Sequence, residues 1–281
     1  MRLTPRRHDR DVAGLTYVYP VVSRRAGGVS IGINLNPNAA CNWRCVYCQV
    51  PGLTYGKGPP IDLELLRREL DGMLAQIFEG DYLEQHVPAE ARRVNDVAFS
   101  GDGEPTSSPQ FCEAVDAAID LLCRRELLGK LEIVLITNGS LTHVAPVQAA
   151  LERLGEHGGE VWFKLDSATE QGIARMNSAH MTPERVARNL RHAAQRCPTW
   201  VQTMVLARDG EPPTPDEVEA YLDFLRDRLE EGLPLRGVLL YGLARPSLQP
   251  EAPTLSPLPR AWMEGLAARL EKLGLTVKLS L

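Results

Sequence analysis

Residues 29–48 read VSIGINLNPNAACNWRCVYC and join an apolar segment to three closely spaced cysteines. The first seven residues, 29–35, are rich in β-branched and apolar side chains, which predicts a buried strand. The polar loop that follows holds Cys41, Cys45 and Cys48 within eight residues. A strand that leads directly into such a loop is typical of a binding site at the carboxyl end of a sheet strand.

The same short apolar strands recur along the chain and alternate with longer helical segments. Strands are expected at 29–35, 94–100, 131–137, 160–166, 200–206 and 236–242. Helices are expected at 61–78, 109–127, 143–155, 182–196, 215–231 and 258–273. This alternation favours parallel strands joined by right-handed helical crossovers. It predicts an α/β fold of six units, built either as an open sheet or as a partly closed barrel.

The composition of the 281-residue chain is that of an ordinary globular protein, with 44% apolar and 24% charged residues. No apolar run reaches the ~18 residues that a membrane span needs. The basic start of the chain lacks the apolar segment of a signal peptide. We therefore expect a cytoplasmic protein with no membrane partner, with a basic leader at 1–28 and one core domain at 29–281.

The charge is distributed unevenly between these two parts. The leader carries six arginines and two aspartates, a net charge of +4, and the remainder carries −9. The total of −5 argues against a protein whose main task is to coat nucleic acid, because such proteins are usually basic. We interpret the leader as a solvated segment, although its arginines could contact phosphate.

Three thiolates on one short loop can surround a metal centre. A structural zinc site needs four ligands, and the next Cys or His residues along the chain are His86 and Cys112. A cluster of four irons normally takes four cysteines, so with three cysteines one iron keeps a coordination position open for a small molecule. Disulfides are not expected in the cytosol. The scattered Cys112, Cys123 and Cys197 are therefore predicted to be core thiols.

Polar residues and glycines occur at the ends of the other predicted strands, where ligands gather in α/β folds. The candidates are Gly101, Gly103, Glu104, Asn138, Ser140, Lys164, Asp166, Gln202 and Arg245. Within the fourth strand Lys164 and Asp166 share one face, since successive side chains alternate. Both are expected to point inward, because the apolar opposite face suits a helix layer. Gln202 and Arg245 are candidate substrate contacts.

Two of these motifs resemble the signature of the radical S-adenosylmethionine (SAM) superfamily. The first is the C-x-x-x-C-x-x-C spacing of Cys41, Cys45 and Cys48, with Tyr47 before the last cysteine. The second is the Gly-Asp-Gly-Glu turn at 101–104, which resembles a Gly-Gly-Glu turn of that family. The resemblance implies a partial (β/α)6 barrel, in agreement with the six units expected from the alternation.

The resemblance can be narrowed by four further segments. Residues 20–25, 100–106, 137–140 and 164–166 are similar to a bacterial branch of small radical SAM proteins whose nearest named relatives are the tRNA wyosine synthases. The similarity spans roughly residues 19–247. Because no later group of cysteines follows, an auxiliary iron–sulfur cluster is not expected.

The resemblance also implies roles for the candidate residues. The three cysteines would ligate a 4Fe–4S cluster whose open iron binds the amino and carboxylate groups of SAM. Reductive cleavage of SAM would give methionine and a 5′-deoxyadenosyl radical that takes hydrogen from an unidentified substrate. Glu104 would accept a charge-assisted hydrogen bond from the methionine ammonium. The other expected cofactor contacts are Tyr47 near adenine, Gly101 and Gly103 where the backbone approaches the ligand, Asn138, Ser140, Lys164 and Asp166.

Three alternative functions stay open at this point. A tRNA base-modifying radical SAM enzyme is favoured by the basic leader and opposed by the negative remainder. A glycyl-radical activating enzyme shares the cysteine spacing, but the turn at 100–106 fits it less well. A non-catalytic iron–sulfur or zinc protein needs neither an open iron nor a barrel. For an enzyme, the resemblance implies a flavodoxin- or ferredoxin-type electron donor as a partner.

Overall fold

The computed structural model describes residues 3, 13–23 and 27–281, so most of the predicted basic leader lies outside the described residues. The chain forms two compact units, each assembled from separate stretches of sequence. The first unit contains the residues up to 42 together with 56–136 and 149–160, and the second contains 43–55, 137–148 and 161–281. The expectation of a single core domain over 29–281 stays a prediction.

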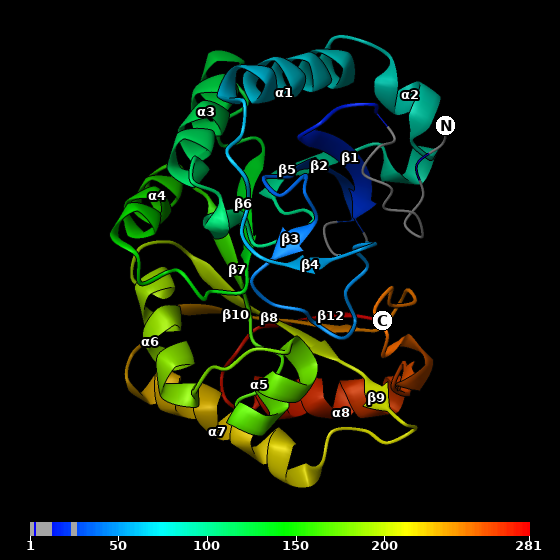
Figure 1. Ribbon diagram of the computed structural model, residues 1–281, viewed down its shortest axis with the longest axis vertical. Helices are drawn as coiled ribbons and strands as arrows, with labels where there is room; N and C mark the ends of the chain where they lie inside the picture. The colour runs from blue at the N-terminus through cyan, green and yellow to red at the C-terminus, as the bar shows by residue number, and fades with distance from the viewer. Residues whose placement is uncertain (1–2, 4–12, 24–26) are drawn as a thin grey trace. The chain divides into compact units, whose positions relative to one another are not determined.

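The first unit is built on a sheet with antiparallel and parallel strands. In sheet order its strands are β1 (Val18–Ser23), β2 (Gly28–Ile33), β5 (Val94–Phe99) and β6 (Glu132–Thr137). β1 and β2 are antiparallel, while β2, β5 and β6 are parallel. Its helices include α1 (Leu63–Phe78), α2 (Tyr82–His86) and α3 (Phe111–Arg124), and the stretch between β6 and β7 forms α4 (Ala145–Glu156). Helices α1 and α3 lie side by side (Figure 1).

The main sheet of the second unit contains parallel strands alone, while β9 and β11 form a separate antiparallel pair. In sheet order these are β7 (Glu160–Lys164), β8 (Thr199–Val205), β10 (Leu235–Gly242) and β12 (Val277–Ser280). Its helices are α5 (Glu170–Asn177), α6 (Pro183–Ala194), α7 (Pro215–Glu230) and α8 (Arg260–Glu271). Short strands occur at β3 (Ala40–Cys41), β4 (Thr54–Tyr55), β9 (Ala207–Arg208) and β11 (Leu255–Ser256). Figure 1 shows α7 and α8 on the same side of β8 and β10.

The two faces of the second sheet differ as strand alternation requires. On one face of β7, Val161 and Phe163 are at most 1% exposed. Lys164, the last residue of β7, lies on the other face and is only partly buried. Thr203 points toward α7, because its hydroxyl forms a 2.6 Å hydrogen bond with the hydroxyl of Tyr221. The neighbouring Gln202 therefore lies on the opposite face of β8, away from this helix.

All six predicted strands and all six predicted helices are present within a few residues of the expected bounds. The strand β1 was missed, since Pro20 interrupts its apolar pattern. Proline is tolerated there because β1 is an edge strand of its sheet. The short elements α5 and β12 were also missed, since eight and four residues carry little periodicity.

The prediction of three core thiols has a mixed outcome. Cys197 is buried as predicted and Cys112 is partly buried, but the core position predicted for Cys123 is wrong, because its side chain is exposed on α3.

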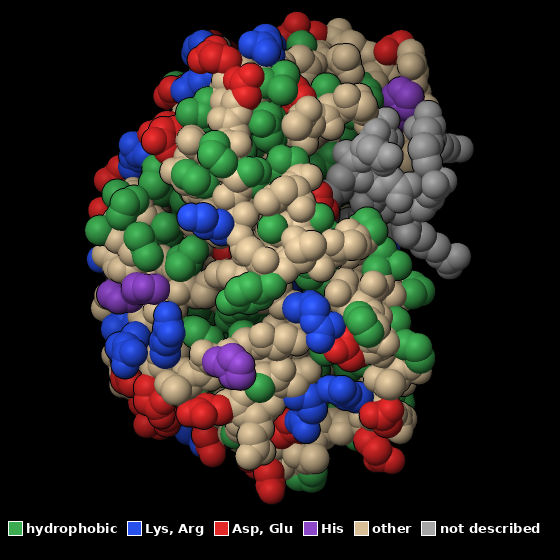
Figure 2. Space-filling model, in the orientation of Figure 1, with side chains coloured by type: hydrophobic (Ala, Val, Ile, Leu, Met, Phe, Trp, Pro, Cys, Tyr) green, Lys and Arg blue, Asp and Glu red, His purple; other side chains and the backbone are tan. Residues whose placement is uncertain are grey.

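No helix in the described part of the chain is long and apolar enough to cross a membrane. Figure 2 shows acidic and basic side chains interspersed on the face drawn, as expected for a chain with a small net charge.

Candidate functional site

The Gly-Asp-Gly-Glu turn of the first unit packs closely against the loop that leaves β2. Asn34 forms two hydrogen bonds with Asp102. Its Nδ2 donates to Asp102 Oδ2 at 2.6 Å, and its Oδ1 accepts from the Asp102 backbone N–H at 3.0 Å. A Cβ at Gly101 would lie 2.3 Å from Asn34 Oδ1. A Cβ at Gly103 would lie 2.1 Å from the carbonyl oxygen of Ala40. Glycine is therefore required at both positions by close contact with the residues that precede Cys41.

Glu104 follows this turn and is 3% exposed. Its Oε1 accepts hydrogen bonds from the backbone N–H of Thr106 at 3.2 Å and from the Thr106 hydroxyl at 2.6 Å. A buried carboxylate held in one orientation is suited to bind a cation, because the cost of desolvating the carboxylate is already met by fixed donors.

In the second unit, residues 43–50 of the cysteine loop are attached to α5 and to the segment after β10. The backbone N–H groups of Arg44 and Val46 donate to the carbonyls of Asn177 and Met176 at 3.1 and 2.9 Å. The Ser247 hydroxyl donates to the carbonyl of Val46 at 2.7 Å. This part of the loop is thus held by backbone hydrogen bonds on both sides of Cys45.

The Arg44 guanidinium adds an ion pair to this attachment. It binds Glu251 with two hydrogen bonds of 2.8 and 2.7 Å. The hydrogen bond from Arg44 holds the pKa of the Glu251 carboxyl below its ordinary value. The pair joins the residue before Cys45 to the short segment that precedes β11.

The side chain of Cys45 belongs to a buried polar network. Asn177 Nδ2 lies 3.2 Å from Cys45 Sγ and 2.7 Å from Asp166 Oδ2. Asp166 also accepts the Tyr47 hydroxyl on Oδ2 and the Met204 backbone N–H on Oδ1 at 3.0 Å. Burial raises the pKa of the Cys45 thiol to about 11, and nearby Lys164 opposes this rise. Binding of a metal would therefore have to displace the thiol proton.

Burial, together with the neighbouring Asp166 charge, raises the pKa of the Tyr47 phenol well above its ordinary value. Tyr47 is therefore protonated over the usual pH range and donates to Asp166. Because three donors converge on Asp166, its oxygens are already used by the protein. Asp166 thus orients Tyr47 and Asn177, and its expected contact with the cofactor stays a prediction.

Lys164 and Gln202 are brought together on one face of β7 and β8, where they are register partners. The Lys164 ammonium lies 3.4 Å from the Tyr241 hydroxyl and 4.8 Å from the centre of the Tyr47 ring. Burial alone would lower the pKa of Lys164, but its interactions with Tyr241 and Asp166 raise the pKa overall, so the amine is cationic. Gln202 is 1% exposed and its Nε2 has no hydrogen-bond acceptor.

Asn138 and Ser140 form a buried turn in the second unit. Asn138 Oδ1 accepts from the Ser140 backbone N–H at 3.0 Å. Asn189 of α6 donates to the carbonyls of Gly139 and Ser140 at 2.9 and 3.3 Å. Gly139 has a φ of +71° and leaves no room for a Cβ against the Phe163 ring. The turn is therefore rigid, and contact of Asn138 and Ser140 with a cofactor stays a prediction.

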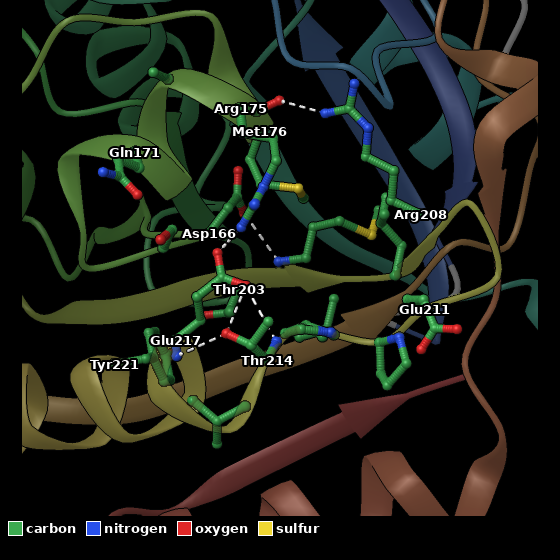
Figure 3. Close-up of a pocket in the computed structure, with 18 of the residues that line it drawn as sticks. Asp166, Gln171, Arg175, Met176, Thr203, Arg208, Glu211, Thr214, Glu217 and Tyr221 are labelled. Carbon is green, nitrogen blue, oxygen red and sulfur yellow. Dashed lines mark hydrogen bonds and ion pairs between the residues drawn. The ribbon is translucent and has the colours of Figure 1, made fainter.

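A cavity of about 990 Å³ lies in the second unit at the end of β8, against α5, α7 and α8 (Figure 3). Its volume is at the upper end of the range for small-molecule sites. Its apolar lining includes Met176, Met204 and Trp262, and Asp166 forms part of its wall. Neither Gln202 nor Arg245 lines it, so the cavity is separate from these two candidate substrate contacts.

Sequence reasoning missed Asn177 and Met204, both of which contact Asp166. Asn177 lies on α5, which was not predicted, and its hydrogen bonds to Cys45 and Asp166 bridge 132 and 11 residues of sequence. Within the described residues, no three Cys, His, Asp or Glu side chains converge as a single-ion site would require. The assignment of the three cysteines to one centre therefore rests on their spacing in the sequence and on the donor to Cys45.

The chain matches the sequence model of one protein family. A family model described as the Radical SAM superfamily matches residues 35–225, which is well over half of the chain. The chain is 30% identical over 162 residues to the UPF0026 protein MJ1312 of Methanocaldococcus jannaschii. That match covers 57% of this chain and 43% of the relative, so the chain corresponds to less than half of the relative's length.

Solved structures give the same fold. A radical SAM methyltransferase from Sphaerobacter thermophilus is similar with a TM-score of 0.62 and 15% identity, over 95% of this chain and 70% of that one. HydG, a maturase of the [FeFe]-hydrogenase, is similar with a TM-score of 0.54 and 13% identity, over 90% of this chain and 50% of that one. At these identities the likeness shows the fold alone, which is the α/β partial barrel expected from the sequence.

Proposed function

Because the chain belongs to the Radical SAM superfamily, we propose that Cys41, Cys45 and Cys48 hold a 4Fe–4S cluster and that the protein cleaves SAM reductively. Enzymes of this superfamily use both the cluster and SAM, and the chain is an enzyme of this kind. The alternative of a non-catalytic iron–sulfur or zinc protein is thereby set aside. When bound, the cluster supplies one electron that breaks a C–S bond of SAM, releasing methionine and leaving a 5′-deoxyadenosyl radical.

The observation that carries the proposal is the environment of Cys45. Its sulfur receives an N–H at 3.2 Å, and the cationic Lys164 lies among the charges that act on it. Both features oppose the rise in the thiol pKa that burial causes, so they would stabilise the Cys45 sulfur once a metal has displaced its proton. The three cysteines are partly buried and none of them is in a disulfide. This chemistry fits a cluster bound by three thiolates.

The roles proposed for the remaining residues follow from their geometry. Glu104, fixed by Thr106, would bind the methionine ammonium of SAM. Gly101 and Gly103 allow the turn to pack against Asn34 and against the backbone of Ala40, the residue before Cys41. Gln202 has a buried donor without an acceptor, and this supports its role as a substrate contact.

The reaction on the substrate is proposed as removal of one hydrogen atom. A one-electron donor of the flavodoxin or ferredoxin type is proposed as the partner, because the cluster must be reduced before each cleavage. No feature of the described residues favours tRNA or a glycyl-radical enzyme as the substrate.

The proposal is tested by cluster loading and by electron paramagnetic resonance (EPR). Anaerobic reconstitution with iron and sulfide should give about four irons per chain, and SAM should change the EPR spectrum of the dithionite-reduced protein. Replacement of Cys41, Cys45 or Cys48 by alanine should abolish loading. Cys123→Ala, at an exposed position on α3, is the matched control and should load normally. Full loading in Cys48→Ala, or an EPR spectrum that SAM leaves unchanged, would contradict the proposal.

A further inference from the structure

Asn177 is the residue whose side chain joins the cluster loop to the end of β7. It is 1% exposed, and its amide nitrogen donates to Cys45 Sγ and to Asp166 Oδ2 at 3.2 and 2.7 Å. An amide nitrogen carries two hydrogens, so both bonds form at once. The reverse orientation would set the amide oxygen against a carboxylate and a sulfur, which are both acceptors. The amide therefore has one favourable orientation.

The backbone holds Asn177 in this position. It is the last residue of α5, and the following Ser178 adopts a left-handed conformation with φ 49° that ends the helix. The carbonyls of Asn177 and Met176 accept the N–H groups of Arg44 and Val46, the two neighbours of Cys45. The N–H to sulfur contact is thus fixed by main-chain hydrogen bonds on both sides of the sulfur.

Asp166 is fixed equally well, by the Met204 backbone N–H and the Tyr47 hydroxyl. Its carboxylate accepts a hydrogen bond from the same amide nitrogen that donates to Cys45, and its charge acts on the Cys45 sulfur. A donor and a negative charge are therefore both held close to one cluster ligand, and they act on the charge of the cluster in opposite directions.

We infer that Asn177 is a positioning residue that raises the reduction potential of the cluster through the Cys45 sulfur, and that Asp166 lowers the same potential. Reduction adds one electron to the cluster. A hydrogen bond donated to a ligand sulfur stabilises the more negative, reduced state, whereas a nearby carboxylate destabilises it. The inference rests on the proposed function, because it requires the cluster at this loop. Together the two residues set the reduction potential of the cluster. A higher potential makes it easier for the electron-donor protein to reduce the cluster, and a lower potential makes the cluster a stronger reductant of SAM.

The test is an EPR-monitored redox titration of the reconstituted protein without SAM. Asn177→Leu removes both donors at similar side-chain size. We expect about a tenfold smaller ratio of reduced to oxidised cluster at a fixed potential, which for one electron is a shift of about 59 mV to more negative values. Asp166→Asn removes the negative charge and should shift the potential in the opposite direction. Asn177→Ala is titrated in parallel, because it removes the donors without the bulk of leucine.

Asn189→Leu is the matched control. Asn189 is 2% exposed and donates to two backbone carbonyls of the second unit, but not to sulfur. Asn189→Leu should leave the reduction potential of the cluster unchanged, even if the substitution lowers the stability of the protein. Equal shifts in the Asn177 and Asn189 variants would overturn the inference, since they would reflect general damage.

The inference is also overturned if the Asn177 variants keep the wild-type potential, or if they shift in the same direction as Asp166→Asn. Failure of both Asn177 variants to load iron would count against it as well, because a residue that tunes the potential is not required for assembly. These outcomes are distinct from failure of the proposed function, in which the wild-type EPR spectrum does not respond to SAM.

Discussion

Replacing Asp166 with asparagine tests whether its carboxylate holds together the second unit's part of the cysteine loop. In the native protein Oδ1 accepts from the Met204 backbone N–H, and Oδ2 accepts from Asn177 and Tyr47. Asparagine offers one oxygen and one NH₂ group. If the oxygen stays opposite the Met204 N–H, the new NH₂ group faces the Asn177 amide, which is itself a donor.

The magnitude follows from these contacts. A hydrogen bond to a charged group contributes about 1.5–3 kcal/mol, and an unsatisfied buried donor costs about 1–3 kcal/mol. The Tyr47 hydroxyl can turn and accept from the new NH₂ group, so only the bond from Asn177 is lost outright. We expect the free energy of unfolding to fall by about 3 kcal/mol. At about 2–4 °C per kcal/mol, the melting temperature should fall by roughly 6–12 °C.

The assay is thermal unfolding of the cluster-free, reduced protein, followed by circular dichroism. Asp223→Asn makes the same chemical change in an exposed ion pair with Arg226 one turn along α7. Such pairs contribute little, so this control should stay within about 0.5 kcal/mol of wild type. A melting temperature of Asp166→Asn within about 2 °C of wild type, or an equal loss in the control, would refute the reasoning.

Three further substitutions, with Gly72→Ala as a control, test the first unit and the attachment of the cysteine loop in the second unit. Gly103→Ala would place a Cβ 2.1 Å from the carbonyl oxygen of Ala40. It should lower the free energy of unfolding, measured in thermal melts, by about 1–3 kcal/mol. Gly72→Ala, at an open position on α1, should instead stabilise the protein. Glu104→Gln removes the proposed partner of the methionine ammonium, so the SAM dissociation constant measured by calorimetry should rise about tenfold or more, and an unchanged constant would exclude that role. Arg44 lowers the pKa of the Glu251 carboxyl in the folded protein. The ion pair therefore contributes its full stability above the unfolded pKa of about 4.3. This contribution is lost as the pH falls through the lower pKa of the folded protein. Glu251→Gln should therefore flatten the acid side of the stability–pH curve, and a curve parallel to that of wild type would contradict the importance of the pair.

The strands and helices were predictable because buried strands and amphipathic helices have strong periodicity in this chain. The three cysteines were also accessible from sequence, since their spacing within one loop needs no tertiary information. The edge strand β1 was not predicted, because the tolerance of Pro20 depends on its place at the edge of the sheet.

The polar network around Cys45 was beyond prediction for a different reason. Its members Tyr47, Asp166, Asn177 and Met204 are far apart in sequence, and Met204 takes part through its backbone N–H alone. The expectation that Lys164 and Asp166 share one face shows the same limit. Alternation along a strand cannot show that Asp166 already accepts hydrogen bonds from three other donors.

The most direct test of the radical SAM assignment is the amount of 5′-deoxyadenosine formed from SAM. Reconstituted protein is incubated anaerobically with SAM and dithionite, and the products are quantified by liquid chromatography and mass spectrometry. We predict 5′-deoxyadenosine and methionine in equal amounts from the wild-type protein and neither product from Cys45→Ala. A wild-type protein that is fully loaded with its cluster and forms no 5′-deoxyadenosine would contradict the assignment of reductive SAM cleavage to this chain.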